Sequence, residues 1–225
     1  MTAMRKTFHF RTRLLISVLL ASITVSVRAA DAVCPDLALK EIKDALGNGG
    51  HVVVFRHSDK CGSEEVPPAQ CTDNSFAQQT KCEDKKQRLS KKGRQLADTI
   101  GRHAKPLIRP VEVYASTSCR ALETAEIAFG ALSLRNVTDD VKTLSGIRKL
   151  ASLDNNRNAP QENIVIVTHW SALKKISGQG FKCGEAAILK RAEETGYTCI
   201  ARVEPNKWQG GTRKPIEYYN SQCKN

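Results

Sequence analysis

Two histidines and two arginines are the residues whose types and placement point most directly to chemistry. Arg56, His57, Arg120 and His169 each follow closely after a short apolar run. A guanidinium group binds phosphate oxygens through a bidentate fork and stays charged at neutral pH. An imidazole can act as a nucleophile or as a proton carrier in the same pH range. A pocket that combined two of each would hold a phosphoryl group and accept it on nitrogen.

The apolar runs that precede these residues are predicted strands. Residues 51–55, 111–115 and 163–167 are short and rich in β-branched side chains. The first and the last of them lack polar alternation, which is typical of strands buried on both faces. In sheets of this kind, ligands bind outside the carboxyl ends of the strands. We therefore expect the two histidines and the two arginines to converge on one rim of the sheet.

Predicted helices alternate with these strands. The alternation indicates a single α/β domain with a mostly parallel sheet. Ser90 is expected to cap the second helix, and Gly130 to end the third. The predicted helices cover residues 35–46, 90–104, 118–129 and 172–176, a short strand covers 137–141, and a hairpin at the sheet edge uses 186–191 and 198–203.

The composition is that of a folded, moderately basic protein. Hydrophobic residues make up 40% and charged residues 26% of the 225 residues, which excludes a mainly disordered or collagen-like chain. The net charge is +12, but residues 1–30 hold five basic and no acidic residues, so the remainder carries 30 basic against 23 acidic residues, or +7. This surplus suits a small phosphate-bearing or otherwise anionic partner rather than nucleic acid. It leaves the oligomeric state open.

Residues 1–30 are interpreted as a secretory signal peptide. Basic residues lead into the apolar run 14–27, and small residues follow at Ala29, Ala30 and Ala32. The run has 14 residues, whereas a membrane-spanning helix needs ~20. We therefore expect residues 31–225 to be a periplasmic or secreted domain without a stable membrane anchor. The alternative is an uncleaved anchor.

All eight cysteines follow the predicted signal, which favours disulfides in an exported protein. The sequence has no C-x-x-C spacing of the kind that metal sites use, and no metal or other cofactor is expected. We predict a Cys183–Cys199 disulfide, a Cys34–Cys223 disulfide, and a group of three cysteines within an inserted polar loop at 58–88. Free thiols are the alternative. The grouped cysteines are Cys61, Cys71 and Cys82.

Other polar and aromatic residues are expected to be structural. His51 begins a strand, and His103 lies late in a helix, where it can interact with the helix dipole. Asp59 is expected to orient the loop after the first strand, and Trp208 to be a packing residue. The lysine-rich stretch 81–92 is interpreted as a solvated face.

Four segments of the chain resemble motifs of the histidine phosphatase superfamily, and the resemblance extends from about residue 51 to about residue 191. Its members have a three-layer α/β/α, phosphoglycerate mutase-like fold. The ordered set of motifs is more specific than any one of them. The segments are Arg56-His57 directly after a strand, Leu89 to Ala97, Tyr114 to Ala125, and Val165 to His169, with Gly184-Glu185-Ala186 near the end.

The resemblance implies a role for each of the four residues. His57 would attack phosphorus and carry a phosphohistidine. Arg56 and Arg120 would bind the phosphoryl oxygens, and His169 would donate to the same oxygens and, when protonated, neutralise developing charge. Phosphoryl transfer depends mainly on positioning and charge neutralisation. The implied activity is therefore a metal-independent phosphomonoesterase of the histidine acid phosphatase type.

The sequence departs from the family pattern at the general acid. Many members place Glu or Asp after the helix that follows Arg120, but residues 141–148 hold no acidic residue, and Trp170 stands where another branch has Asp. Because general acid catalysis is typically worth about 10²–10⁴-fold, the acid comes from elsewhere, the leaving group is a good one, or turnover is slow. The possible substitutes are Asp139, Asp140, Asp154, Glu64 and Glu65.

The substrate and the activity remain open between alternatives. The chain is similar to exported phosphatases acting on lipopolysaccharide core heptose, which would make the substrate an envelope glycan or sugar phosphate. The absent acid leaves a second possibility, a non-catalytic module that binds a phosphorylated ligand on the same fold. A third is a disulfide-exchange protein using Cys119, against which the lack of a C-x-x-C motif argues.

Overall fold

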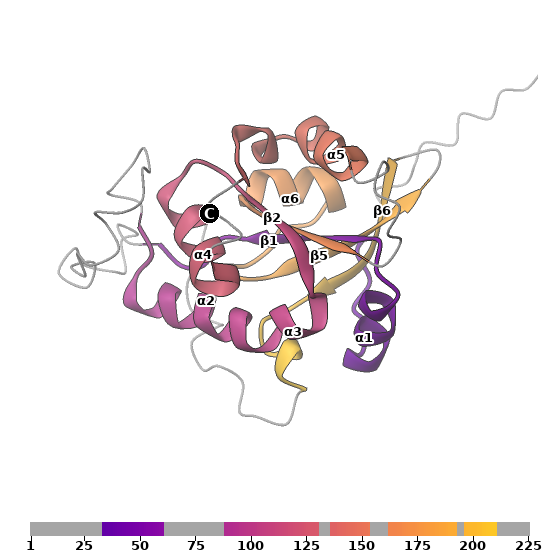
Figure 1. Ribbon diagram of the computed structural model, residues 1–225, viewed down its shortest axis with the longest axis horizontal. Coiled ribbons are helices and arrows are strands. Elements are labelled where there is room, and N and C mark those ends of the chain that lie inside the picture. The colour runs from indigo at the N-terminus through magenta and orange to yellow at the C-terminus, as the bar shows by residue number, and fades with distance from the viewer. Residues whose placement is uncertain (1–32, 61–87, 131–135, 154–161, 193–195, 211–225) are drawn as a thin grey trace, which may run out of the picture. The chain divides into compact units, whose positions relative to one another are not determined.

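The computed structural model describes residues 33–60, 88–130, 136–153, 162–192 and 196–210 (Figure 1). The predicted signal peptide and most of the predicted inserted loop, with its three cysteines, lie outside these residues. Among the residues so described, no helix combines the length and the apolar character needed to cross a membrane.

The centre of the fold is a six-stranded sheet. Its strands are β1 (His51–Arg56), β2 (Pro110–Ala115), β3 (Asn136–Val137), β4 (Asn163–Thr168), β5 (Ala186–Ala192) and β6 (Gly196–Val203). They lie in the order β3-β2-β4-β1-β5-β6. Strands β3, β2, β4 and β1 are parallel to one another, whereas β5 pairs antiparallel with both β1 and β6, so that β5 and β6 form a hairpin at the sheet edge. The predicted α/β class and the edge hairpin are confirmed. The prediction of a mostly parallel sheet is not exact, because the sheet is mixed, with three parallel and two antiparallel pairings among the described strands.

The two central strands are as buried as their sequences indicate. All six residues of β1 and all six of β4 are buried, which explains why both runs are apolar and β-branched. The two strands pair in parallel so that Arg56 lies beside Thr168. His57 and His169, the next residues along each strand, therefore leave the sheet at the same level.

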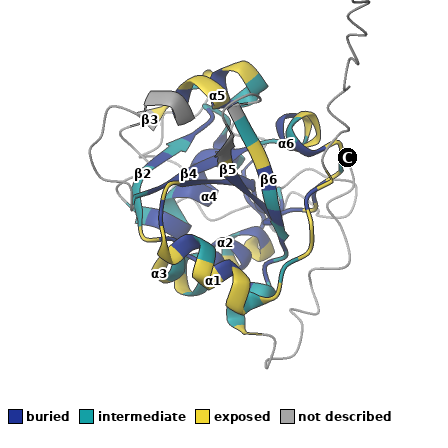
Figure 2. Cartoon of the chain, turned by 90° about the vertical axis from the view of Figure 1, so that its right-hand side faces the viewer, coloured by how far each residue is buried: buried dark blue, intermediate teal, exposed yellow. Residues whose placement is uncertain are grey.

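Helices cover both faces of the sheet, which gives three layers (Figures 1 and 2). One face packs on a hydrophobic cluster with residues from α1, α2, α3 and α4, and the other on a second cluster with residues from α5, α6 and the 3₁₀ helix η4. The helices are α1 (Leu39–Gly47), α2 (Lys91–His103), α3 (Lys105–Ile108), α4 (Cys119–Phe129), η4 (Asp139–Lys142), α5 (Leu144–Leu153), α6 (Trp170–Ser177) and η6 (Lys207–Gln209).

The chain before α1 corrects the prediction of a helix over 35–46. The backbone carbonyl of Pro35 accepts a hydrogen bond from Arg202 N at 2.8 Å, and Asp36 bridges to the same residue of β6. This segment is therefore extended alongside the sheet, and α1 starts only at Leu39.

The segment around residue 140 corrects a second prediction. Of the expected strand 137–141, Val137 pairs with β2, and the observed strand β3 consists of Asn136 and Val137. The Thr138 hydroxyl then accepts a hydrogen bond from Asp140 N at 3.2 Å, which starts the 3₁₀ helix η4. The following helix α5 was not predicted from the sequence.

The disulfide pattern differs from the one expected. Cys34 is bonded to Cys199, with a Cα–Cα distance of 5.1 Å, because the extended segment before α1 lies beside β6. The predictions of Cys183–Cys199 and Cys34–Cys223 are therefore wrong. Cys183 belongs to the hydrophobic cluster on one face of the sheet, and Cys199 to the cluster on the other, so those two thiols cannot meet.

None of the described cysteines is free. Cys119 and Cys183 are also disulfide-bonded, and the side chain of Cys119 is fully buried. A buried, oxidised cysteine offers no thiolate for attack. The disulfide-exchange alternative stays a prediction, which the complete burial of Cys119 disfavours.

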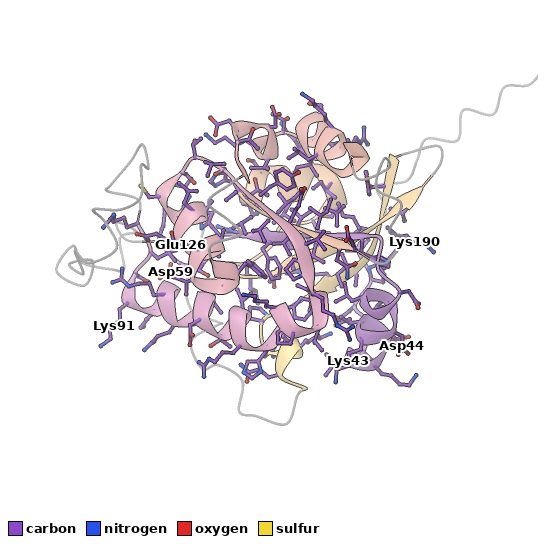
Figure 3. All side chains as sticks on the ribbon, in the orientation of Figure 1. Lys43, Asp44, Asp59, Lys91, Glu126 and Lys190 are labelled. Carbon is purple, nitrogen blue, oxygen red and sulfur yellow. A yellow bond between two sulfur atoms is a disulfide. The ribbon has the colours of Figure 1, made fainter. Side chains whose placement is uncertain are left out.

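Two predicted helix ends are confirmed. The Ser90 hydroxyl accepts a hydrogen bond from Gly93 N at 2.9 Å, as an N-cap does, and Gly130 ends α4 with φ of 76°. The same Ser90 hydroxyl donates to the Asp59 carboxylate at 2.8 Å. A Cβ at Gly93 would lie 2.0 Å from the Asp59 carbonyl oxygen. Asp59, labelled beside α4 in Figure 3, thus ties the loop after β1 to the start of α2, as expected.

Two further residues are structural, as the sequence indicated. Trp208 is 3% exposed, and its ring centroid lies 6.0 Å from that of Phe55. His51 is buried at the start of β1, and its backbone N–H donates to the Asn163 side chain at 3.1 Å.

Candidate active site

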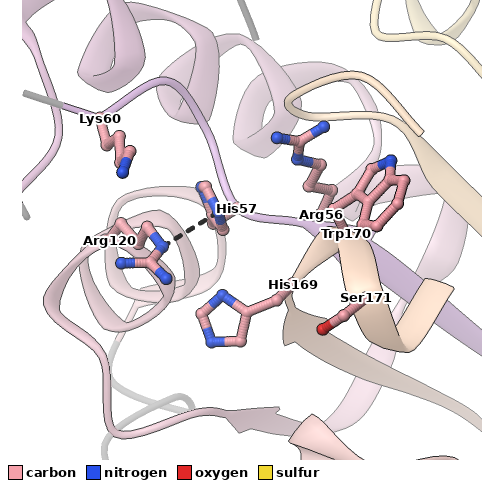
Figure 4. Close-up of a pocket in the computed structure, with 7 residues that line it drawn as sticks. All are labelled: Arg56, His57, Lys60, Arg120, His169, Trp170 and Ser171. Atoms are coloured by element: carbon pink, nitrogen blue, oxygen red, sulfur yellow. Dashed lines mark hydrogen bonds between the residues drawn. The ribbon is translucent and has the colours of Figure 1, made fainter. Parts of the chain in front are cut away.

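The four candidate residues meet at the carboxyl ends of three adjacent strands. Arg56 is the last residue of β1, His169 separates β4 from α6, and Arg120 lies in the first turn of α4, which follows β2. Together with His57 they line one cavity of about 240 Å³ (Figure 4). Adjacent parallel strands end on the same side of a sheet, and this brings residues 113 positions apart into one pocket.

His57 is fixed at both ends of its ring. Its backbone N–H donates to Thr168 O at 2.9 Å, and its Nδ1 lies 2.7 Å from Ser58 O. A carbonyl oxygen can only accept, so Nδ1 carries the proton and Nε2 holds a lone pair. Arg120 Nε donates to that Nε2 at 3.0 Å. The imidazole therefore presents an unprotonated nitrogen next to a guanidinium, which is the arrangement that a nucleophile towards phosphorus requires.

The surroundings of His57 keep it neutral. Burial lowers its pKa well below 6.5, and the positive charges of Arg120 and Arg56 and the neighbouring His169 lower the pKa further, against the raising effect of the Ser58 carbonyl. A proton on Nε2 would remove the lone pair. The low pKa therefore keeps His57 in its nucleophilic form at neutral and mildly acidic pH.

His169 faces His57 across the cavity. The two ring centroids are 5.4 Å apart. His169 Nε2 lies 2.7 Å from the Ser116 hydroxyl and 3.3 Å from the Ser118 hydroxyl, whereas Nδ1 is buried without a hydrogen-bond partner. When Ser116 donates to Nε2, the proton sits on Nδ1. That nitrogen can then donate to an oxygen of a bound phosphoryl group.

The pKa of His169 is lowered. Burial, followed by the charges of Arg120 and Lys142, lowers it to about 4. At neutral pH, His169 is therefore a neutral hydrogen-bond donor. Any positive charge on it requires the negative charge of a bound phosphoryl group to raise its pKa.

The two arginines differ in how they are held. Arg56 is 5% exposed, its backbone N–H donates to Glu185 O at 2.9 Å, and its Nη1 donates to Phe181 O. Arg120 is half-buried on α4 and contacts His57 directly. The pair thus combines a guanidinium anchored by backbone with one that is aligned on the nucleophile.

Three further residues line the cavity and were not assigned to it from the sequence. Lys60, Trp170 and Ser171 complete its wall, and Lys60 is anchored by a bridge to Leu89. Figure 4 shows the Lys60 side chain beside Arg120. Their proximity in sequence to the two histidines could have identified two of them. Lys60 follows His57 by three residues, and Trp170 directly follows His169. Ser116 directly follows β2 and lies within the motif segment from Tyr114 to Ala125.

No carboxylate lines this cavity among the residues that the structure describes. Asp139 accepts hydrogen bonds from Thr117 Oγ1 at 2.6 Å and pairs with Lys142 at 2.7 Å. The hydrogen bond with Lys142, and then that with Thr117, lowers the Asp139 pKa. An acid held ionised in this way carries no proton to give to a leaving group.

Of the other candidate acids, the structure describes Asp140 alone. Asp140 is exposed, and it is not among the residues that line the cavity. Asp154, Glu64 and Glu65 lie outside the described residues. No group of three or more His, Cys, Asp or Glu side chains in the described residues could hold a metal ion.

Comparison with known proteins gives structural resemblances only. No family model and no curated protein matches the chain. A protein histidine phosphatase, SixA, solved with tungstate, is 17% identical with a TM-score of 0.48 over 69% of this chain and 97% of that one. A mycobacterial glucosyl-3-phosphoglycerate phosphatase is 12% identical with a TM-score of 0.45 over 68% and 95%. At such values, the function proposed below rests on this chain's own residues.

Proposed function

We propose that this protein is an exported phosphatase that hydrolyses a phosphomonoester through a phosphohistidine on His57, without a metal ion. One observation carries the proposal. His57 Nε2 is unprotonated, accepts a hydrogen bond from Arg120 Nε and belongs to a residue that lines one cavity with Arg120 and His169, while Nδ1–H is held by the Ser58 carbonyl. The pocket thus brings together a nucleophile, a group that orients it and donors for the phosphoryl oxygens.

In the first step, Arg120 Nε–H transfers its hydrogen bond from His57 Nε2 to an oxygen of the bound phosphoryl group, and the freed Nε2 lone pair attacks phosphorus. The N–P bond forms as the ester P–O bond breaks, and the bonding pair leaves on the alcohol oxygen, which takes up a proton. The phosphorylated ring gains positive charge, which the Ser58 carbonyl stabilises through Nδ1–H. Arg56, Arg120 and His169 Nδ1 are placed to donate to the three non-bridging oxygens, where charge develops in the transition state.

In the second step, water attacks phosphorus from the side of the departed alcohol. A P–O bond forms, the N–P bond breaks, and its electron pair returns to Nε2. Inorganic phosphate and one proton are released, and His57 regains the state in which it began.

The need to protonate the leaving oxygen restricts the class of substrate. Because no carboxylate lines the cavity among the described residues, leaving groups that depart readily as oxygen anions are favoured over plain alkoxides. Of the three explanations for the missing acid, a good leaving group therefore fits best. An envelope sugar phosphate, which the similarity to the exported heptose phosphatases suggests, would draw its proton from water or from Glu64 or Glu65.

Location outside the cytoplasm is part of the proposal. The basic and apolar pattern of residues 1–30 is that of a signal peptide. The Cys34–Cys199 disulfide and the oxidised Cys119 and Cys183 are consistent with an oxidising compartment. The periplasm or the extracellular space would provide it.

The test is to trap the phosphorylated protein. The purified domain is incubated with radiolabelled aryl phosphate and quenched in base, and the retained label is then tested for acid lability. We expect label on the wild type and on His103→Ala, a half-buried histidine of α2, and none on His57→Ala. Hydrolysis by the wild type without label, or label that persists in His57→Ala, would contradict the proposal.

The absence of a carboxylate in the described pocket also keeps a second function open. A module of this fold could bind a phosphorylated ligand without turning it over. Binding of vanadate or phosphate, with no hydrolysis of any aryl phosphate between about pH 4 and about pH 9, would identify the binding module instead.

A further inference from the structure

A second pocket adjoins the candidate active site. It has a volume of about 440 Å³ and is lined by Trp170, Ser171, Lys174, Lys175 and Gly178. Trp170 and Ser171 also line the cavity that contains His57. The two hollows therefore share a wall, and a ligand bound in one can extend into the other.

The helix α6 builds this pocket in a fixed geometry. Lys174 lies one turn after Trp170, and its Nζ is 4.7 Å from the centroid of the indole ring, a cation–π contact. A Cβ at Gly180 would lie 3.1 Å from Trp170 Nε1. The indole is thus enclosed between a lysine and a close-packed backbone segment, and it holds the Lys174 ammonium group at the pocket.

The positive charge of this pocket has no counter-charge within the described residues. Neither Lys174 nor Lys175 forms an ion pair there, whereas other lysines do, such as Lys40 with Asp44 at 2.9 Å and Lys142 with Asp139 at 2.7 Å. Both lie in the last turn of α6, where a positive charge interacts favourably with the helix dipole. The helix dipole accounts for two lysines at this end of α6, but it does not account for a pocket beside them that adjoins the active site.

We propose that this second pocket, called here the α6 pocket, binds a second anionic group of the substrate. The inference rests on the proposed phosphatase function and names its substrate class: a phosphomonoester that carries a further phosphate or carboxylate. Trp170 and Ser171 stand between the two hollows as their shared wall. The two anionic groups are therefore on different parts of the substrate and not attached to neighbouring atoms.

Competitive inhibition of 4-nitrophenyl phosphate hydrolysis tests the proposal, because it does not require the probe to be turned over. Glucose 6-phosphate serves as the probe with one anionic group, glucose 1,6-bisphosphate as the probe with a second phosphate, and 6-phosphogluconate as the probe with a carboxylate. We expect the inhibition constant of at least one two-anion probe to be about tenfold lower than that of glucose 6-phosphate. The probe with the larger gain identifies the second group as phosphate or carboxylate. The gain should shrink as salt is raised.

The variant Lys174→Gln/Lys175→Gln should reduce this tenfold ratio to within about twofold. The matched control is Lys40→Gln/Lys43→Gln, which removes the same charge from α1, a helix that precedes the opposite end of β1 (Figure 3). The control should keep both the ratio and the hydrolysis of 4-nitrophenyl phosphate.

The possible failures can be told apart. If the wild type does not hydrolyse 4-nitrophenyl phosphate at all, the phosphatase function itself fails. If hydrolysis occurs but all three probes inhibit equally, or if the α6 pocket variant keeps the wild-type ratio, the second anion site is overturned and the phosphatase function stands. An equal loss in the control variant would also overturn it, since general charge attraction would then account for the preference.

Discussion

The two ends of the same strands differ in how their polar groups are used. At the amino end of β4, Asn163 is 2% exposed, and its amide meets three backbone groups. Its Nδ2 donates to Leu46 O at 3.0 Å and to Ile108 O at 2.7 Å, and its Oδ1 accepts from His51 N at 3.1 Å. This network joins the ends of α1 and α3 to the sheet and leaves nothing for a ligand.

At the carboxyl end, the polar groups surround a cavity instead. His57 Nε2 accepts a hydrogen bond from the mobile end of the Arg120 side chain, and His169 Nδ1 is buried with no hydrogen-bond partner. Because His51 Nδ1 at the amino end is also buried without a partner, the distinguishing feature of the carboxyl end is the cavity that its polar groups line. The comparison therefore separates a structural end from a functional end of one sheet, and the predictions below test that separation, in order of expected effect.

Arg120→Lys should have the largest effect. Lysine retains the charge but loses the planar fork that aligns with both His57 Nε2 and a phosphoryl group. Since loss of one oriented transition-state donor typically costs about 10²–10³-fold, we expect kcat/KM for an aryl phosphate to fall by about that factor. The midpoint of thermal unfolding should stay within about 3 °C of wild type.

The control for this prediction is Arg102→Lys on α2. Arg102 is exposed and pairs with Asp98 at 2.6 Å, and it is remote from the cavity-lining residues. If both variants lose activity to the same extent, or if Arg120→Lys retains wild-type kcat/KM, the carboxyl end does not work as described.

Asn163→Ala should have the opposite profile. It leaves two carbonyls and one N–H without their partner in the protein interior, so we expect the free energy of unfolding to fall by about 3 kcal/mol. Turnover by the folded fraction should not change. Denaturant titration measures the free energy of unfolding. Turnover is measured as kcat without denaturant, at a temperature well below the unfolding midpoint.

Asn163→Asp sharpens this test. The carboxylate has nearly the same shape and still accepts from His51 N, but it places oxygen against Leu46 O and Ile108 O. We therefore expect at least as large a loss of stability as in the alanine variant. Wild-type stability in both variants would show that the network at the amino end has little structural weight.

The residues of the candidate site were easier to predict from the sequence than the structure around them. The placement of Arg56, His57 and His169 follows from buried β-branched strands and from the rule that parallel strands end on one side. Ser90 and Gly130 are local signals, and each cap is formed within its own turn. These features depend on neighbours in sequence or on one topological rule, which is why they could be predicted.

Other features depend on contacts between distant segments. The pairing of Cys34 with Cys199 requires knowing that the segment before α1 lies beside β6, and that Cys183 lies on the other face of the sheet. The neutral state of His169 results from burial, which no local pattern reveals. Lys60 enters the cavity only because its backbone bridges to Leu89 across a gap of 29 positions.

The acid limb of the pH profile gives the third prediction. Burial and neighbouring charges lower the pKa of His57 well below 6.5, and that of His169 to about 4. A histidine with a lowered pKa loses its neutral form only as the pH falls through that lower value. After correction for the substrate's own ionisation, kcat/KM should therefore be flat from about pH 7 to about pH 5 and fall below that.

A profile that falls with an apparent pKa near 6.5 would contradict this prediction, because it would indicate a nucleophile with ordinary solvation. The control is His51, whose lowered pKa has burial as its main cause but which lies at the amino end of β1. Its titration should affect stability and leave the pH dependence of kcat/KM in the folded protein unchanged.

Ser116→Ala should have the smallest effect, and it tests the carboxyl end most finely. The Ser116 hydroxyl is 2.7 Å from His169 Nε2 and sets which ring nitrogen carries the proton. The Ser118 hydroxyl lies 3.3 Å from the same nitrogen and can partly replace that of Ser116. We therefore expect kcat to fall only about three- to tenfold, with KM little changed.

A purely structural role for Ser116 predicts the same loss whether or not His169 is present. If Ser116 acts by positioning His169, the serine substitution should cost nothing further in a His169→Ala background, and a double-mutant cycle measures that difference directly. Full additivity would show that the serine supports the loop and not the imidazole.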